Sequence, residues 1–412
     1  MDKNYKIEVL EDVSGLGKVK GFKVAGVGCD IRNKNDLSRL DTALVVSDTL
    51  ATASGVFTTN DVKAAPVITD MRHLEASSKV KAIIANSGNA NACTGDRGMR
   101  DAEDTCKFVG ELVGAKPEQV LVCSTGRIGE FMPMEKLRGG IKSAFEKLSN
   151  SDESGAAAAS AIMTSDTRPK TVLVNVEFNG KNFSVAGMAK GAGMIEPNMA
   201  TMLAFLVSDA AVSQTLLKEA LRSAANKTFN RMTVDGDMST NDTVLCLCNG
   251  ASGVEISETD ADAIEAFRAA ITAASRVLAR KIVGDGEKIT KVVEVKVVGA
   301  RDEAQAEKIC RSIGNSLLVK SSWFGCDPNW GRLTDAAGYA RTGIVLDKID
   351  LFYDNVEVLR KGQPVDENKP LWKKIVANKT FTVLMNLNLG NAEESILAAD
   401  LTEGYVNFNK GE

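Results

Sequence analysis

Histidine is almost absent from this chain of 412 residues, which contains only His73. A Ser-His-Asp or Cys-His arrangement would therefore depend on that one residue. His73 lies in the polar stretch 71–79, where a surface position is the more economical interpretation. Any reactive hydroxyl group in this chain would need a base of another kind.

Other absences exclude further classes of protein. The eight cysteines form no C-x-x-C pair, which argues against a zinc ribbon or a redox motif, and we expect most of them to be reduced and buried. A formal net charge of -4 gives no electrostatic reason to expect nucleic acid as a partner. No apolar run approaches the roughly 18 residues of a membrane span, and residues 1–12 do not resemble an export signal. These features predict a soluble, cytoplasmic protein.

Metal and nucleotide motifs are also missing. The acidic string 235–242 fails the pattern of a calcium-binding EF-hand, because the sixth position is Thr240 and the twelfth is Cys246. Neither the P-loop spacing nor the G-x-G-x-x-G spacing occurs at the glycine turn 124–129. We therefore expect no metal and no bound cofactor.

Short apolar runs typical of β-strands alternate with patterns typical of helices. The composition is that of an ordinary globular protein, for which this length suggests about two or three domains. Periodicity leaves the strand pairing open, so it predicts only a mixed α and β protein. Strands are expected at 43–46, 82–85, 120–123, 172–178, 183–186, 202–207, 292–298 and 381–387, and helices at 99–113, 134–148, 214–229 and 260–283.

One junction combines a flexible loop with a buried strand. Residues 187–200 contain three glycines and a proline, and they run directly into the apolar stretch 202–207, with Thr201 between them. Cleavage between Ala200 and Thr201 would free an α-amino group, which titrates near about 8 and can act as the base beside the Thr201 hydroxyl. Attack of that hydroxyl on the Ala200 carbonyl would give an ester that water opens. The alternative is that Thr201 merely begins a strand.

Three other segments could contribute to a site. At the turn after strand 120–123, the Gly126 amide and the Thr125 hydroxyl could donate hydrogen bonds to a developing oxyanion, although a plain turn is the alternative. The asparagine-rich segment 86–91 is expected to serve a turn. Glu287 follows a long helix, where it is either a solvated loop residue or a partner for a substrate ammonium.

Several segments match a known family, in the same order, along nearly the whole chain. They are 57–60 (FTTN), 63–66 (KAAP), 86–95, 124–126 (STG), 162–164 (IMT), 166–170 (DTRPK), 190–194 (KGAGM), 198–203 (NMATML) and 326–332 (CDPNWGR). Together they closely resemble the ornithine acetyltransferase family, also called glutamate N-acetyltransferase, of arginine biosynthesis. So many matches in order make chance similarity an inadequate explanation.

The resemblance implies an α+β fold, a four-layer α-β-β-α sandwich with mixed sheets. It also implies that the chain cleaves itself into an α-subunit, residues 1–200, and a β-subunit, residues 201–412, which assemble as a heterotetramer of two α and two β chains. By the same likeness Thr201 is the nucleophile, and Thr125 and Gly126 form the oxyanion hole. The substrate-binding positions carried over are Thr164, Lys190, Thr201, Glu287 and Asn409.

The implied reaction moves an acetyl group from N2-acetyl-L-ornithine to L-glutamate, giving ornithine and N-acetylglutamate through an acetyl-Thr201 intermediate. Acetyl-CoA as an additional donor is left open by the residues. Two alternative functions remain open beside this acetyl transfer. One is a self-processed N-terminal-nucleophile amidase or aminopeptidase that passes the acyl group to water. The other is an uncleaved protein that binds amino acids or acts as a scaffold.

The chain departs from the family at two places. Family members usually end in a hydroxyl residue that touches substrate, whereas Asn409 is followed here only by Lys410, Gly411 and Glu412. The surroundings of Glu287, in the segment 286–291, are bulkier and more cationic than is common in the family. Both departures concern the affinity for substrate or the choice of substrate.

Overall fold

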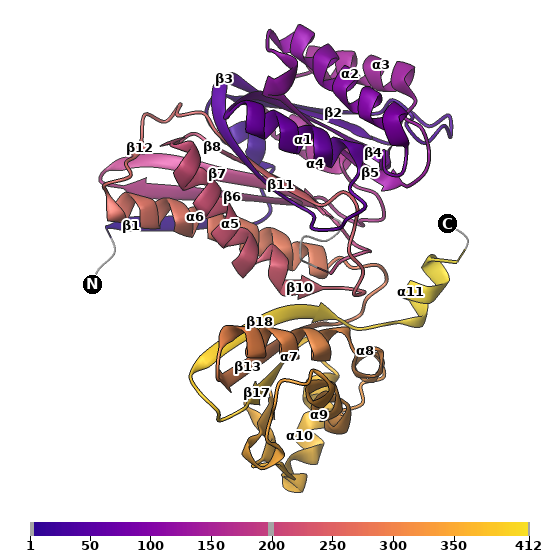
Figure 1. Ribbon diagram of the computed structural model, residues 1–412, viewed down its shortest axis with the longest axis vertical. Helices are drawn as coiled ribbons and strands as arrows, with labels where there is room; N and C mark the ends of the chain where they lie inside the picture. Colours follow the sequence, from indigo (N-terminus) through magenta and orange to yellow (C-terminus); the bar gives the residue numbers. More distant parts are fainter. Residues whose placement is uncertain (1–3, 197–201, 411–412) are drawn as a thin grey trace. The chain divides into compact units, whose positions relative to one another are not determined.

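The computed structural model describes residues 4–196 and 202–410 (Figure 1). Within this part of the chain, no helix is long and apolar enough to cross a membrane. The chain divides into two compact units. Unit 1 is Met1–Gly191, Asn198–Asn230 and Met238–Ile282, and unit 2 is Ala192–Pro197, Arg231–Asp237 and Val283–Glu412. Unit 1 therefore takes residues from both sides of the 200/201 junction.

Unit 1 is built on a nine-stranded mixed sheet. Its strand order is β1-β6-β7-β8-β11-β3-β4-β5, with β2 also paired to β3. β8 runs parallel to β11 and β4 runs parallel to β5, whereas the other neighbours are antiparallel. The strands are β1 Tyr5–Leu10, β2 Phe22–Val27, β3 Thr42–Phe57, β4 Lys79–Asn89, β5 Val120–Arg127, β6 Lys170–Phe178, β7 Lys181–Lys190, β8 Leu203–Ser208 and β11 Thr243–Cys248. A two-stranded sheet adds β9 Ala211–Val212 and β12 Glu255–Ile256.

The long strand β3 belongs to two halves of this sheet. Its first part pairs with β2 and β4, its last part pairs with β11, and the register with β4 shifts between Val46 and Ala51. Such an irregularity bends a strand. As a result, side chains of both halves pack in one core, where Leu121 of β5 lies in the same cluster as Phe205 of β8.

Helices cover the outer faces of the two halves. On β5, alternate side chains such as Val122 point to the other face, where they join Cys106 of α2 and Ile141 of α3. On the other half, a Cβ added at Gly187 of β7 would meet Leu278 of α6, so that helix packs directly on the sheet. The helices of unit 1 are α1 Ala65–Ala76, α2 Gly95–Val113, α3 Met134–Glu146, α4 Asp152–Ala161, α5 Gln214–Lys227 and α6 Ala261–Val283.

The layers of unit 1 are therefore helices, half-sheet, half-sheet and helices (Figure 1). This confirms the predicted α+β class and its four-layer α-β-β-α sandwich. The individual helices and strands expected from periodicity are also present, and Gly114, at φ 69°, ends α2 in the left-handed conformation. Six of the eight cysteines are buried and none of the eight forms a disulfide, in agreement with the prediction.

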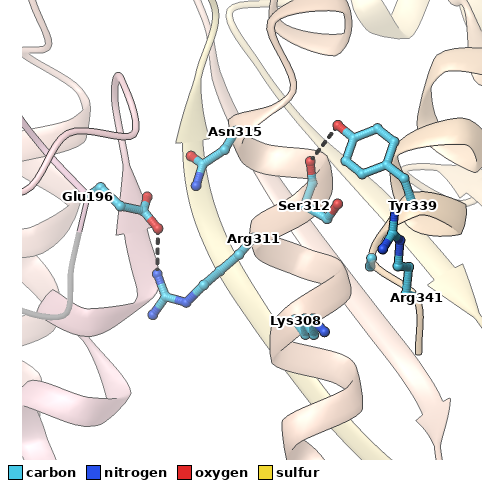
Figure 2. Close-up of a pocket in the computed structure, with 8 residues that line it drawn as sticks. Glu196, Lys308, Arg311, Ser312, Asn315, Tyr339 and Arg341 are labelled. Atoms are coloured by element: carbon cyan, nitrogen blue, oxygen red, sulfur yellow. Dashed lines mark hydrogen bonds and ion pairs between the residues drawn. The ribbon is translucent and has the colours of Figure 1, made fainter.

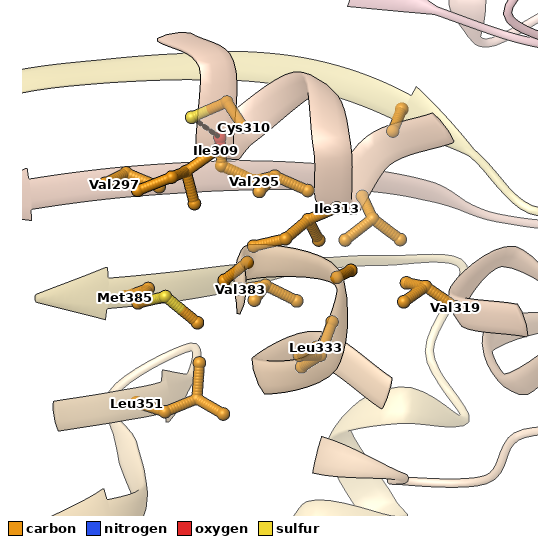
Figure 3. Packing of buried hydrophobic residues seen from close by; sticks show 14 of the residues in the cluster. Val295, Val297, Ile309, Cys310, Ile313, Val319, Leu333, Leu351, Val383 and Met385 are labelled. Atoms are coloured by element: carbon orange, nitrogen blue, oxygen red, sulfur yellow. Dashed lines mark hydrogen bonds between the residues drawn. The ribbon is translucent and has the colours of Figure 1, made fainter. Parts of the chain in front are cut away.

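Unit 2 contains its own sheet and helices, and the sequence did not predict where this unit begins and ends. Its sheet has the order β10-β18-β13-β17-β14-β15-β16. Val295 and Val297 of β13 pack with Ile309 and Ile313 of α7 and with Val383 of β17 (Figure 3). The strands are β10 Met232–Thr233, β13 Val292–Ala300, β14 Asp350–Tyr353, β15 Val356–Arg360, β16 Gln363–Pro364, β17 Thr380–Asn386 and β18 Ala392–Ala399, and the helices are α7 Glu303–Asn315, α8 Leu317–Phe324, α9 Trp330–Tyr339, α10 Lys369–Val376 and α11 Glu403–Phe408.

Candidate active site

Thr125 and Gly126 lie at the end of β5, where the strand continues further than its sequence predicts. We expected a turn directly after Cys123, but parallel pairing with β4 extends β5 to Arg127. Gly126 adopts φ 133°, and a Cβ there would lie 2.3 Å from the carbonyl carbon of Gly88. Only glycine fits this close approach of two strands. The Thr125 side chain is buried, whereas Gly126 is exposed.

Asparagine side chains hold this strand end in place. The Ser124 hydroxyl donates to Asn86 Oδ1 at 2.6 Å, and Asn86 Nδ2 donates to the Asn89 carbonyl at 2.9 Å. Asn241 Nδ2 donates to the carbonyls of Ser124, at 2.8 Å, and Ala90, at 2.7 Å. Residues 86–89 belong to strand β4 rather than to the expected turn, and the Asn86 side chain binds a backbone carbonyl. Asn241 is a residue that sequence reasoning missed, because nothing local links it to β5.

A buried carboxylate organises the loop of Thr164 and the end of β7. Asp166 Oδ1 accepts hydrogen bonds from Lys170 Nζ at 2.6 Å and from the Gly191 amide at 2.7 Å, and its Oδ2 accepts from the Thr164 amide at 3.0 Å. Lys190, the last residue of β7, is only 2% exposed. Asp166 therefore brings two predicted site residues, Thr164 and Lys190, into one cluster.

The charge of Asp166 follows from its neighbours. Burial by itself disfavours the carboxylate, but the cationic Lys190 and Lys170 and the Gly191 amide outweigh burial and lower the pKa of Asp166 to about 2. Asp166 was quoted in the sequence only as part of a motif, and it had no assigned role. The feature of the sequence that could have indicated its pairing is that Asp166 lies four residues before Lys170.

Ala200 and Thr201 lie outside the described residues, but both flanks of this junction are held by carboxylates. On the N-terminal side, Asp235 accepts hydrogen bonds from the amides of Met194 and Ile195 at 2.6 and 2.7 Å. On the C-terminal side, Asp242 Oδ1 accepts from the Met202 amide at 2.8 Å. The acidic string that resembled a calcium loop thus binds backbone amides.

The strand after the junction is buried, as predicted. All six residues of β8 and the preceding Met202 are buried, and β8 lies between β7 and β11. Burial raises the pKa of Asp242 well above its usual value, although the Met202 amide and the Lys190 charge oppose this effect. Burial therefore favours the protonated form of the Asp242 carboxyl, where it meets the start of β8, more than in an ordinary aspartate.

Glu287 and Asn409, both in unit 2, lie next to each other. Asn409 Nδ2 donates to Glu287 Oε2 at 3.0 Å, and the Glu287 amide donates to the Ala192 carbonyl at 2.9 Å. The Glu287 carboxylate lies against Gly193, where an added Cβ would be 2.5 Å from its carboxyl carbon. The cationic neighbour Lys288 lies over the Phe408 ring at 5.2 Å from the centroid.

His73 and a surface hollow are two further features of the described residues. The His73 ring is half-buried on α1 and bonds to the Val120 carbonyl at 2.8 Å. Val120 begins β5, so Thr125 is five residues further along this strand, a separation of about 16 Å. In unit 2 a hollow of about 480 Å³ is lined by Lys308 and by Arg311, whose guanidinium pairs with Glu196 at 2.9 Å (Figure 2). This hollow contains none of the predicted site residues.

The sequence matches the model of the ArgJ family over residues 23–411. The chain belongs to the ArgJ family. It is 44% identical over 392 residues to the arginine biosynthesis bifunctional protein ArgJ of Geobacter sulfurreducens, with 95% of this chain and 98% of that protein covered. It is 42% identical over 395 residues to the ArgJ protein of Symbiobacterium thermophilum, with 96% and 97% covered. This membership confirms the predicted class, an acetyltransferase of arginine biosynthesis.

Solved ArgJ structures were also matched. One, the bifunctional protein argJ from Bacillus halodurans, is 37% identical with a TM-score of 0.44, and the match covers 47% of this chain and 100% of that chain. Another, the ornithine acetyltransferase of Mycobacterium tuberculosis complexed with ornithine, is 37% identical with a TM-score of 0.43, covering 47% of this chain and 98% of that chain.

Because the pKa of Asp166 is lowered in the folded protein, we predict that the free energy of unfolding falls at acidic pH. A carboxyl whose pKa is lower in the folded state stabilises the fold above its unfolded pKa, about 4, and this stabilisation is lost as pH falls towards about 2. The Asp166→Asn substitution should remove this pH dependence of the stability. At neutral pH it should lower the free energy of unfolding by about 3 to 5 kcal/mol, because two buried lysines lose their counter-charge.

Urea unfolding measured between pH 2 and pH 7 checks this. The matched control is Asp48→Asn, which removes a carboxylate that pairs with Lys23 at the surface, where both side chains are about half exposed. The control should change stability by less than about 1 kcal/mol. Equal effects of the two substitutions would contradict the assigned role of Asp166.

Proposed function

We propose that this chain transfers the acetyl group of N2-acetyl-L-ornithine to L-glutamate through an acetyl-Thr201 intermediate, after cleaving itself between Ala200 and Thr201. The match to the ArgJ family along nearly the whole chain carries this proposal. Ornithine leaves when the Thr201 oxygen takes the acetyl group, and glutamate then collects it, so that the products are ornithine and N-acetylglutamate. This is a ping-pong sequence.

The freed α-amino group of Thr201 is the proposed base. A terminal amine has a pKa of about 8, so an appreciable fraction of it is neutral at physiological pH. His73 is bonded to the far end of β5 and has no part in this chemistry. The burial of Met202 and β8 supports the proposal, because the new terminus would be attached directly to a buried central strand.

The acetyl carbonyl carries negative charge in the transition state, and we assign its stabilisation to Thr125 and Gly126. The asparagine contacts around Ser124 support this assignment, because they fix the end of β5 before substrate arrives. Donors that are already oriented pay no reorganisation cost during the reaction.

An amino acid presents a carboxylate and an ammonium, and the chain offers groups of both signs. Lys190, with Thr164 beside it, suits the carboxylate. Glu287, with Asn409 as its neighbour, suits the ammonium. Charge-assisted hydrogen bonds of this kind are the stronger ones in proteins. Neither assignment requires a metal or a bound cofactor, and acetyl-CoA remains open as a second donor.

The two pieces would remain associated after cleavage. Residues 1–200 supply β7 and β3, and residues 201–412 supply β8 and β11. β8 pairs with β7, and β11 pairs with β3, within one sheet. A break at 200/201 therefore leaves the ladder of unit 1 intact. Two copies of each piece form the proposed heterotetramer.

Denaturing electrophoresis tests the cleavage. The wild-type protein should give two pieces of 200 and 412 − 200 = 212 residues, and the second should begin Thr-Met-Leu-Ala in N-terminal sequencing. Thr201→Ala should give a single full-length band without turnover, because both attacks need the hydroxyl, while Thr201→Ser should keep both. A full-length wild-type band with activity would contradict this mechanism.

The acceptor distinguishes the transferase from a self-processed amidase. Release of ornithine from N-acetylornithine should require glutamate, and N-acetylglutamate should form in equal amount. The assay measures both products with and without glutamate. Ornithine release at the same rate without glutamate would instead establish hydrolysis, with water as the acceptor.

Gly193→Ala tests the role of Glu287 without touching its charge. The new Cβ would lie 2.6 Å from both Glu287 carboxylate oxygens, so the carboxylate must turn away. We expect kcat/KM for N-acetylornithine to fall about 10- to 100-fold, the worth of one charge-assisted hydrogen bond. Gly139→Ala, where a Cβ meets nothing within 4 Å, is the control and should leave kcat/KM unchanged. An unchanged kcat/KM in Gly193→Ala would show that the Glu287 carboxylate does not bind the substrate.

A further inference from the structure

Thr164 lies in a loop of unit 1, where no strand ladder or helix fixes its backbone. The loop runs from the end of α4 to the start of β6, and loops are in general more mobile than the elements that they connect. The proposed function assigns Thr164 to the substrate carboxylate. A hydroxyl group serves such a role well only when its backbone keeps one orientation, so the contacts that hold this loop bear on substrate binding.

Arg39 contacts Thr164 from a distant loop of the same unit. Its Nη2 donates to the carbonyl oxygens of Thr164 at 3.0 Å and of Met163 at 3.2 Å. The Thr164 amide is held separately, by Asp166 Oδ2 at 3.0 Å. The peptide groups on both sides of the Thr164 Cα atom are therefore held. Because each peptide group is planar, holding both of them fixes the two backbone dihedral angles of Thr164 and the direction of its side chain.

The guanidinium of Arg39 is oriented for these two carbonyls. Its Nε is buried and has no hydrogen-bond partner within residues 4–196 and 202–410. A buried N–H group without a partner costs free energy, so this orientation satisfies Met163 and Thr164 at the expense of the Nε group. The planar donor geometry of a guanidinium also suits two acceptors at once, whereas the ammonium of a lysine is a point charge on a flexible stem.

The loop that carries Arg39 is anchored independently of Thr164. It joins β2 to β3, and the Asp41 carboxylate at its end accepts hydrogen bonds from the amides of Cys29 and Ile31, each at 2.8 Å. A Cβ added at Gly28 would lie only 2.5 Å from the Arg39 carbonyl oxygen, so the two arms of this loop are in close contact. Arg39 therefore reaches Thr164 from a backbone that is already fixed.

We propose that Arg39 is a positioning residue for the substrate carboxylate, because it holds the backbone of Thr164 in the orientation that presents the hydroxyl. This inference rests on the proposed function, which assigns Thr164 to substrate. Arg39 acts only through Thr164 and does not itself contact substrate. N-acetylornithine and glutamate both carry the carboxylate, so Arg39 affects the binding of the donor and of the acceptor.

A double-mutant cycle tests this coupling in the full-length protein, with kcat and KM measured for wild type, Arg39→Gln, Thr164→Ala and the double variant. Arg39→Gln should raise KM for both substrates about 10-fold and leave kcat nearly unchanged, because a carboxylate contact is the same in the ground state and the transition state. Thr164→Ala should also raise KM. The double variant should have the KM of Thr164→Ala, because the hydroxyl that Arg39 positions is already missing.

Arg301→Gln is the matched control. Arg301 Nη2 also donates to a loop carbonyl, that of Thr342, at 2.6 Å, but it lies in unit 2. This substitution should leave KM for both substrates unchanged. An unchanged KM in Arg39→Gln would overturn the inference. Effects of Arg39→Gln and Thr164→Ala that multiply in the double variant would overturn it too, because Arg39 would then support the fold without acting through Thr164.

Arg39→Lys decides the matter if Arg39→Gln does not fold, because it keeps the positive charge but not the planar donor geometry. It should raise KM less than Arg39→Gln, and again add nothing to Thr164→Ala, whereas multiplying effects would overturn the inference. An unchanged KM in Thr164→Ala would overturn it together with the assignment of Thr164. If the wild-type protein forms no N-acetylglutamate, the proposed function itself fails, so the two failures are distinguishable.

Discussion

The hydrogen-bond ladder of β8 is the constraint on which the rest of this structure depends. β8 is entirely buried, antiparallel to β7 and parallel to β11. Its backbone groups must be satisfied by these neighbours, because water does not reach them. The chain has to enter this strand at Met202, and Asp242 and Thr243 hold that residue by its amide and its carbonyl.

The pKa values of two buried aspartates near this strand are shifted in opposite directions, and their neighbours explain the difference. Asp166 faces two lysines and an amide, which stabilise the carboxylate more than burial penalises it. For Asp242, burial outweighs the amides of Met202 and Ser239 and the charge of Lys190, so its pKa is raised. Asp166 can therefore fix the charge around Thr164 and Lys190, while Asp242 holds the Met202 amide. Separating the pKa values of similar groups is a common way to divide roles in an active site.

Local sequence patterns predicted the elements of the fold well. The short apolar run 120–123 predicted β5, and Gly114 correctly marked the end of α2, because both signals depend on near neighbours. The turn after Cys123 was wrong, because pairing with β4 prolongs the strand. The limits of unit 2 were missed for a similar reason. Its residues 192–197 and 231–237 are separated in sequence from the rest of the unit.

The sequence by itself determined which chemistry is possible: one histidine, a threonine between a glycine loop and an apolar run, and the family motifs that name Thr125, Lys190 and Glu287. Only the tertiary structure decided which groups act on one another. Asp242 meets Met202 across 40 residues, and Glu287 meets Asn409 across 122. Such contacts depend on strand order and register, which no local periodicity encodes, because the same alternation of side chains is compatible with many pairings.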